Sequence, residues 1–420
     1  MIVCDPRRSR ATVQEDRLRM SRPHSAMAGR TRRAWLAAMV AGTAGLVAGC
    51  SFNLSDLGLG SREAAQPAQP ATTVGSGEVR AALILPFSAS GNAGLAAQSM
   101  KNAAEMALAE FSAQNIQLLV KDDAGTTQGA YQAAQQALDE GAEIILGPPF
   151  AHSVGQVGQV ARPRGVPVIA FSTDANVAAR GVYLLSFLPE SDVDRIVGYA
   201  IAQGKRSFAA LVPDDPYGTV VQAAFQQTVA RRGGRVVAME RYPTDPQQKQ
   251  EAIARVAQAS AQADAIFIPD ATDSGALVQA LTASGVNPRR VQFLGTGLWT
   301  DDPQVFSNPS LQGAWFAAPE PAGYRSFVTR YRSRFGRDPL RTATSAYDAV
   351  SLVVALVKTQ GAQRFTEQVL TNASGFSGVD GIFRFRADCT NERGLAVLRV
   401  TTSGGQVISP APKAFAGSGT

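Results

Sequence analysis

Small polar residues stand in this sequence at points where backbone N–H groups are expected to lack partners. Ser88 and Gly91 follow an apolar run at residues 81–86, and Ser153 opens a segment in which apolar residues have helical spacing. The first turn of a helix presents unpaired N–H groups and a positive dipole end, which favour an anion. Ser153 would equally serve as an ordinary N-cap. These three residues are therefore candidate ligand-binding residues for a carboxylate or a similar anionic group.

Candidate catalytic groups are scarce. His24 and His152 are the only two histidines. A Ser-His-Asp triad or a multi-histidine metal site is therefore not expected. We expect His152 to be a surface or capping residue. No G-x-G-x-x-G motif follows the first predicted strand, which argues against a bound dinucleotide. The sequence thus predicts a protein that is not an enzyme and that holds no metal and no cofactor.

The charge is unevenly distributed along the chain. Residues 1–50 contain nine arginines and three acidic residues, whereas residues 51–420 contain 31 basic and 31 acidic residues. Affinity for DNA or RNA comes largely from stripes of positive charge that neutralise phosphates. Because the main part of the chain has no net charge, we expect no nucleic-acid partner.

Residues 1–50 have the layout of a signal peptide, in which basic residues precede an apolar run at 34–48 and then small residues. This run of about 15 residues is shorter than the roughly 20 needed for a membrane-spanning helix. Residues 46–50, Leu-Val-Ala-Gly-Cys, resemble a bacterial lipobox. The resemblance implies lipidation of Cys50, and the alternative is an ordinary signal peptide with a chance cysteine. We expect a periplasmic protein that is anchored to the membrane by lipid on Cys50.

The segment 51–78 is rich in Ala, Pro, Gln, Ser, Thr and Gly and has no apolar period. Such a composition buries too little apolar surface to fold. The sequence predicts a flexible tether between the lipid anchor and a folded part that begins near residue 79.

From residue 79 onward, short β-branched runs alternate with longer amphipathic stretches, a pattern typical of parallel α/β units. The alternation runs to residue 203 and restarts at residue 207, which predicts two doubly wound, Rossmann-like lobes. Open sheets of this kind bind ligands at the carboxyl ends of their strands. The expected strands are 80–86, 116–121, 143–146, 167–171 and 182–187 in the first lobe, then 207–212, 235–242, 265–268 and 291–294 in the second, with 381–385 and 395–400 near the end.

Several segments together resemble a known family, the type I periplasmic solute-binding proteins, of which the leucine/isoleucine/valine-binding proteins are the best-known branch. The segments occur in family order over about residues 79–402, at 81–88, 144–148, 165–173, 214–218, 331–339 and 346–349. The resemblance implies two lobes joined by a hinge that close on a small solute, an amino acid or a similar polar molecule, and present it to an ABC permease. We expect lobe one at 79–188 with 319–374 and lobe two at 189–318 with 375–408.

The resemblance also assigns roles to single residues. Ser172 and Thr173 would contact the ligand at the end of a lobe-one strand, and the ring of Tyr217 would close over it. The family's glutamate for the ligand ammonium has no counterpart in residues 294–301, which weakens the expectation of an α-amino acid. The candidates for that role and for a wall of the cleft are Asp270, Asp301 and Trp299.

A branch of the same family offers a second function. The lipobox-like segment, the tether and residues 375–385 resemble lipoproteins that are similar to penicillin-binding protein activators. That resemblance implies a regulatory protein that contacts a peptidoglycan synthase. The sequence leaves both functions open, the transport receptor first and the synthase activator second.

Overall fold

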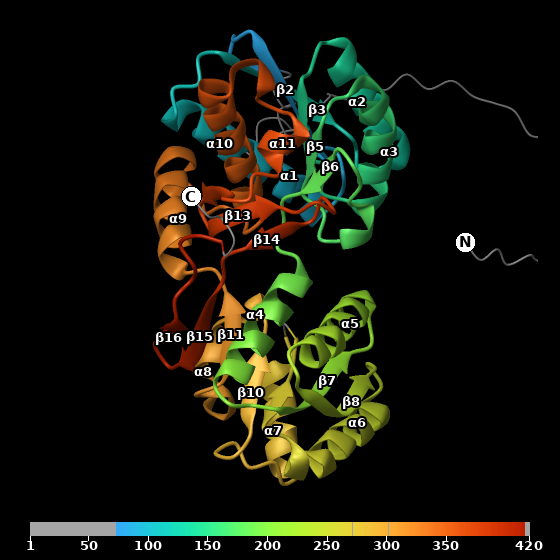
Figure 1. Cartoon of the computed structure of the whole chain (residues 1–420), viewed down its shortest axis with the longest axis vertical. Coiled ribbons are helices and arrows are strands. Elements are labelled where there is room, and N and C mark those ends of the chain that lie inside the picture. Colours follow the sequence, from blue (N-terminus) through green and yellow to red (C-terminus); the bar gives the residue numbers. More distant parts are fainter. Residues whose placement is uncertain (1–72, 271, 301, 416–420) are drawn as a thin grey trace, which may run out of the picture. The chain divides into compact units, whose positions relative to one another are not determined.

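The computed structural model describes residues 73–415 except Ala271 and Asp301. These residues belong to one compact unit, Pro67–Thr420. Two sheets of mainly parallel strands, each with helices packed on both faces, form its two lobes (Figure 1). The predicted fold class is thereby confirmed. No helix in this described part of the chain combines the length and the apolar character that a bilayer crossing requires.

The first sheet has six strands in the order β1-β3-β2-β4-β5-β6. All neighbouring pairs are parallel except β1 with β3. The strands are β1 (Thr73–Val74), β2 (Val79–Leu85), β3 (Ile116–Asp122), β4 (Ile144–Leu146), β5 (Val168–Ala170) and β6 (Val182–Leu184). Strand β1 lies within the predicted tether, so that prediction is wrong for Thr73 and Val74, which pair with Leu119 and Leu118.

Strand β2 shows why this sheet is covered on both faces. Its residues Leu83 and Leu85 belong to one buried cluster, and Ala82 and Ile84 belong to another on the opposite face. A strand that is apolar at consecutive positions, as β2 is from Ala81 to Leu85, needs a partner layer on each side. Helices α1 (Asn92–Glu110) and α10 (Ala343–Thr359) cover one face, and α2 (Thr127–Asp139) and α3 (Ala151–Ala161) cover the other (Figure 1).

The second sheet has seven strands in the order β16-β15-β11-β10-β9-β7-β8. The strands β7 to β11 are parallel, and β15 and β16 are antiparallel additions. The strands are β7 (Ser207–Pro213), β8 (Arg235–Tyr242), β9 (Ala265–Phe267), β10 (Gln292–Gly295), β11 (Trp315–Ala318), β15 (Ala396–Thr401) and β16 (Gly404–Ser409). Its helices are α4 (Pro189–Ala202), α5 (Pro216–Arg231), α6 (Pro246–Ala259), α7 (Ser274–Ala283) and α8 (Pro303–Ser307).

A third, three-stranded sheet consists of β12 (Phe376–Gly378), β13 (Gly381–Phe385) and β14 (Asn391–Arg393). Phe383 and Phe385 on β13 are buried in the core between the first sheet, α1 and α10. The structure therefore differs from the predicted boundary at residue 375. Residues 376–393 pack with lobe one because β13 turns its rings into that core, and only β15 and β16 join the second sheet.

The chain passes between the two sheets at three places. These are the links between β6 and α4, between β11 and α9 (Pro321–Phe335), and between β14 and β15. The shorter elements are α11 (Glu367–Leu370) and the 3-10 turns η2 (Arg162–Arg164), η3 (Ala175–Val177), η4 (Ser260–Gln262), η5 (Gly297–Trp299), η6 (Pro309–Leu311) and η7 (Gly361–Gln363).

The packing of the third sheet can be tested with Phe383→Ala. The Phe383 ring is fully buried and packs 5.7 Å from the Phe376 ring and 5.9 Å from the Phe385 ring, measured between centroids. We expect the substitution to lower the free energy of unfolding by about 3–5 kcal/mol, measured by urea unfolding. Val407→Ala on β16, where the side chain is 40% exposed, should change it by less than about 0.5 kcal/mol. Equal effects of the two variants would contradict this packing.

Candidate functional site

A cavity of about 330 Å³ lies at the edge of the first sheet where its parallel strands end. Residues that directly follow β2, β4, β5 and β6 line it, together with the first turns of α1 and α10. This is the place at which open α/β sheets bind ligands. The lining residues are Pro86, Asn92, Ala93, Ala96, Ala97, Met100, Pro149, Phe150, Phe171, Thr173, Ser186, Phe187, Thr342 and Ser345.

The lining is mostly apolar and has an aromatic wall. Phe150, Phe171 and Phe187 supply rings, which can bury 150–250 Å² each in a contact. None of the lining residues is acidic or basic. A cavity of this size and character can enclose a small solute with an apolar body, since ligand sites are mostly apolar with a few placed polar groups.

Three helices begin at this cavity. The N-terminal regions of α1, α3 and α10 carry no side-chain cap and no acidic residue in the first turn. The residue before α1 is Gly91, whose φ of 67° lies in the left-handed region that favours glycine. Uncapped helix starts present N–H groups and positive dipole ends. The apolar cavity therefore has an electrostatic preference for a negatively charged group.

Two arginines stack on the Phe187 wall of the cavity. The guanidinium carbons of Arg341 and Arg393 lie 4.6 Å and 4.4 Å from the centre of the Phe187 ring. Arg341 donates hydrogen bonds of 2.9 Å and 2.6 Å to the two carboxylate oxygens of Asp380. Arg393 donates through Nε to the carbonyl oxygen of Ser186 at 2.9 Å. Phe187 is thus held between the cavity and two charged residues, one of which lies where β14 leads into lobe two.

The charges behind Phe187 are buried and incompletely paired. Arg393 is 5% exposed and Asp348 on α10 is 1% exposed. Both terminal guanidinium nitrogens of Arg393 and Oδ2 of Asp348 have no hydrogen-bond partner within the described residues. Burial raises the pKa of Asp348 to about 7, although the nearby positive charge of Arg393 acts to lower it.

Tyr217 and Asp192 lie at the starts of two helices of lobe two, α5 and α4. The hydroxyl of Tyr217, at the start of α5, lies 3.0 Å from Thr296 Oγ1 after β10. Burial raises the pKa of Tyr217. Asp192 in the first turn of α4 accepts a 2.9 Å hydrogen bond from the N–H of Gly297. Burial also raises the pKa of Asp192 to about 7, opposed by that hydrogen bond.

The residues predicted at the ends of the first-lobe strands fall close to the cavity. Thr173 lines it. Ser172 is buried just behind, where its Oγ accepts from the N–H of Asp174 at 3.2 Å and its carbonyl accepts from Ser186 Oγ at 2.7 Å. Ser88 and Gly91 are exposed on the loop between β2 and α1 and do not line the cavity.

Two other predicted site residues lie in the interior of the protein. Ser153 is fully buried near Asp123, and its hydroxyl has no hydrogen-bond partner among the described residues. Burial raises the pKa of Asp123, and Ser153 opposes that shift. Trp299 is fully buried in the core of lobe two and donates from Nε1 to the carbonyl of Asp270 at 2.9 Å. The structure therefore differs from the prediction that Trp299 walls the cleft, because the whole indole packs inside the lobe.

The carboxylate of Asp270 is engaged close to its own backbone. It accepts from the hydroxyl of Tyr242 and from the N–H of Thr272, the latter at 2.8 Å. Two further predicted residues, Asp301 and the lipidation site Cys50, lie outside the described residues. The part of the chain that the structure describes contains no cluster of three or more side chains able to hold a metal ion.

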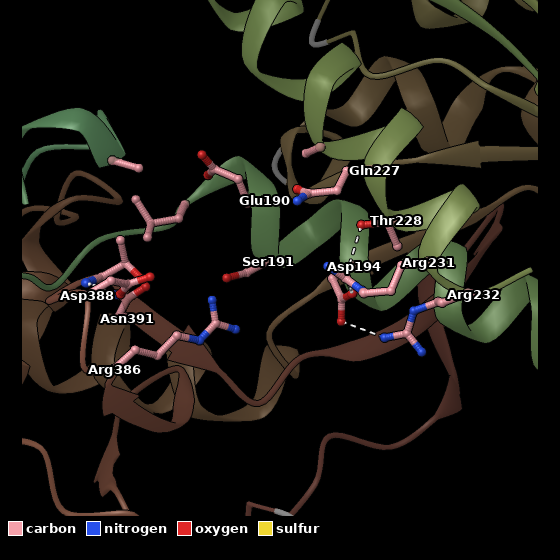
Figure 2. Close-up of a pocket in the computed structure, with 14 residues that line it drawn as sticks. Glu190, Ser191, Asp194, Gln227, Thr228, Arg231, Arg232, Arg386, Asp388 and Asn391 are labelled. Atoms are coloured by element: carbon pink, nitrogen blue, oxygen red, sulfur yellow. Dashed lines mark hydrogen bonds and ion pairs between the residues drawn. The ribbon is translucent and has the colours of Figure 1, made fainter. Parts of the chain in front are cut away.

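A second, larger pocket of about 550 Å³ lies beside the first turns of α4 (Figure 2). Its charges largely satisfy one another. Arg231 and Arg232 both donate to Asp194, at 2.5 Å and 2.7 Å, and the guanidinium of Arg386 points toward Ser191 (Figure 2). The arginine side chains are 39–55% exposed. We therefore place the candidate site in the apolar cavity of lobe one.

Sequence reasoning missed several residues of this cavity. Phe150 and Phe187 were not distinguished from core phenylalanines, and Ser345 lies in a helix that the sequence marks as buried and rich in Ala and Val. The one usable signal was position, since Phe150 follows a predicted strand, Phe187 is the last residue of another, and Ser345 lies in the first turn of a helix.

Comparison with known proteins shows the family of the chain. A family model described as periplasmic binding protein matches residues 78–406, so the chain belongs to the periplasmic binding protein family. No curated protein matches the chain. The prediction of a type I periplasmic binding protein is confirmed.

Solved structures of low sequence identity share the fold. A protein from Rhodospirillum rubrum assigned to a branched-chain amino acid ABC transporter is 20% identical, with a TM-score of 0.70 over 79% of this chain and 99% of that one. An ABC transporter substrate-binding protein from Sphaerobacter thermophilus is 19% identical, with a TM-score of 0.63 over 80% and 98% of the two chains. A solute-binding protein of an ABC transporter from Rhodopseudomonas palustris BisB5, in complex with 3,4-dihydroxybenzoic acid, is 20% identical, with a TM-score of 0.57 over 80% and 97%.

The buried acid Asp348 predicts how stability depends on pH. An aspartate in the unfolded chain loses its proton near pH 4, whereas Asp348 in the folded protein keeps its proton until about pH 7. Between these values the folded state binds more protons, so the free energy of unfolding falls as the pH rises, by at most about 1.4 kcal/mol per pH unit for this group. The fall should level off above pH 7.

In Asp348→Asn this contribution is absent, so we expect a shallower fall of the free energy of unfolding between pH 4.5 and 7. Urea unfolding at a series of pH values measures it. Asp139→Asn, at a side chain that is 66% exposed, serves as the control. A slope in Asp348→Asn equal to that of the wild type would show that Asp348 ionises at its ordinary pH.

Proposed function

We propose that this protein is the periplasmic solute receptor of an ABC transporter, and that it binds a small solute with an apolar body in the cavity of lobe one. The observation that carries the proposal is the cavity itself, which lies at the carboxyl ends of β2, β4, β5 and β6 and is lined by aromatic rings. Membership of the periplasmic binding protein family supports it, and so do the similar structures of ABC transporter binding proteins.

The proposed mechanism is capture by one lobe followed by closure of the second. The solute enters the lobe-one cavity, where Thr173 and the Phe187 wall contact it. Lobe two then contributes Tyr217, and Asp301 is the predicted acid that can still face the solute. Solute binding can favour the closed state only by the difference in its affinity for the two states. The class of solute extends from amino acids to similar small molecules, as the sequence predicts.

The finer localisation is also a proposal. Lipidation of Cys50 would hold the folded part at a membrane face through the tether that precedes residue 73. The lipobox-like residues 46–50 support it. A receptor on such a tether stays near its permease after releasing the solute.

A second function, of another class, has one sequence feature in its favour. Residues 375–385 resemble the activators of penicillin-binding proteins, and they form the hairpin β12–β13. In that case the lobes would contact a peptidoglycan synthase rather than deliver a solute. If the lipidated protein captures a peptidoglycan synthase and no compound in a solute screen stabilises it, this function is favoured over transport.

Filling the cavity tests the first proposal. Ala96 on α1 lines the cavity, whereas its neighbour Leu95 is 60% exposed and does not. A thermal-shift screen of the full chain against amino acids, small carboxylates and muropeptides should give a hit, because a ligand at a hundred times its Kd adds about 2.7 kcal/mol of stability. Ala96→Trp should abolish that shift.

The matched control is Leu95→Trp, which adds the same ring one position away and should bind the hit as the wild type does. Circular dichroism of both variants verifies that they fold. If Ala96→Trp binds the hit with unchanged affinity, the solute does not occupy this cavity. If no compound in the screen stabilises the wild type, the receptor function is contradicted.

The lipid anchor is tested with Cys50→Ser. In cells fed a radiolabelled fatty acid, the wild-type chain should incorporate label and sediment with membranes. The variant should incorporate none and should leave the membrane fraction, because the substitution removes the thiol to which the lipid would be attached. Membrane association that survives in Cys50→Ser would contradict the proposed anchor.

A further inference from the structure

The polar groups of the lobe-one cavity have no partners of their own. Thr342 is the residue before α10, Ser345 lies in its first turn, Thr173 follows β5, and Asn92 begins α1. Among the described residues, none of these four side chains makes a hydrogen bond. Ser345 is only 4% exposed. Because Ser345 lines the cavity and its hydroxyl has no partner in the protein, that hydroxyl is available to a ligand that accepts a hydrogen bond there.

The position of Ser345 indicates what kind of acceptor this is. Helix α10 has 17 residues, no acidic residue in its first turn and no side-chain cap. Thr342 and Ser345 are three residues apart, so their hydroxyls lie on one side of the helix start. Hydroxyls beside the positive end of a helix suit a carboxylate, which is an acceptor with two oxygens.

An ammonium group would find no anionic partner on the wall of this cavity. The cavity lining includes no acidic residue. The acids that follow β7 and β9 in lobe two are already engaged: Asp214 with Arg241 at 2.8 Å, Asp215 with the N–H of Gly218 at 2.6 Å, and Asp270 with Tyr242 and nearby N–H groups. An ammonium group buried beside uncapped helix starts would be repelled rather than bound.

We propose that the cavity selects small carboxylic acids that carry an aromatic or branched aliphatic body and no α-ammonium group, with the carboxylate at Thr342 and Ser345. This inference rests on the proposed function, in which the cavity is the solute site, and it names the class of solute. The body lies among Phe150, Phe171 and Phe187. An α-amino acid of the same shape should bind more weakly, because its ammonium group loses water on binding and no anion on the cavity wall compensates for that loss.

Matched pairs of compounds test the selectivity in the full chain. Isothermal titration calorimetry compares 3-phenylpropanoate with L-phenylalanine, and 4-methylpentanoate with L-leucine. The members of each pair differ only in the ammonium group. We expect the acid of at least one pair to bind at least tenfold more tightly than its amino acid. The same titrations with Asp301→Asn show whether Asp301 supplies an ammonium partner.

The outcomes separate this inference from the proposed function. If an amino acid binds as tightly as its matched acid, or more tightly, the acid selectivity is wrong while solute binding stands. A preference for the amino acid that disappears in Asp301→Asn assigns the ammonium to that residue and equally overturns the inference. If neither acid binds, the acid selectivity also fails, but the receptor function fails only if the wider solute screen is silent as well.

The carboxylate position is tested with Ser345→Ala, which should weaken binding of the preferred acid about tenfold. Ser191→Ala makes the same change in the pocket beside α4 and should leave the affinity unchanged. Thr342→Val provides a second, exposed position on the same helix turn that does not disturb the core. Wild-type affinity in both Ser345→Ala and Thr342→Val would show that the carboxylate does not bind at α10.

Discussion

The parallel hydrogen bonding of β2, β4, β5 and β6 is the constraint on which the rest of this structure depends. Parallel neighbours end at the same edge of a sheet, so the residues that follow these four strands are brought together although they lie as far apart as Pro86 and Phe187 in the sequence. Both faces of the sheet are covered by helices, which leaves the strand ends as the place for a ligand. The aromatic cavity forms at that edge because its rings come from residues that follow these strands.

The buried charges behind the cavity connect its wall to the links between the two lobes. A buried arginine needs compensation for lost hydration, and Arg393 obtains it from the Ser186 carbonyl, the Phe187 ring and the nearby carboxylates. These contacts join the link between β6 and α4 to the link between β14 and β15. The wall of the cavity and two of the three connections between the lobes are therefore packed as one cluster. A solute in contact with Phe187 thus contacts a residue that packs against these connections.

The sequence was sufficient for the fold and for part of the site. The β-branched runs predicted the parallel strands because a strand buried on both faces is apolar throughout, and Thr173 was found because it follows such a strand. Trp299 and Ser153 were assigned to the site from position alone, and the structure buries both side chains, with the indole N–H of Trp299 donating to the carbonyl of Asp270. Phe187 and Ser345 could not be selected beforehand, since their role comes from contacts between segments more than 150 residues apart. The three-stranded sheet was assigned to the other lobe because the pattern of β13 gives no indication of which core its rings enter.

The location of a bound solute is the most direct test of this account. A crystal structure of the protein grown with a solute that the screen identifies should show that molecule in the lobe-one cavity, with its apolar body among Phe150, Phe171 and Phe187 and its acidic group at the first turn of α10. Density for the solute in the charged pocket beside α4, or in no enclosed site, would contradict the central claim.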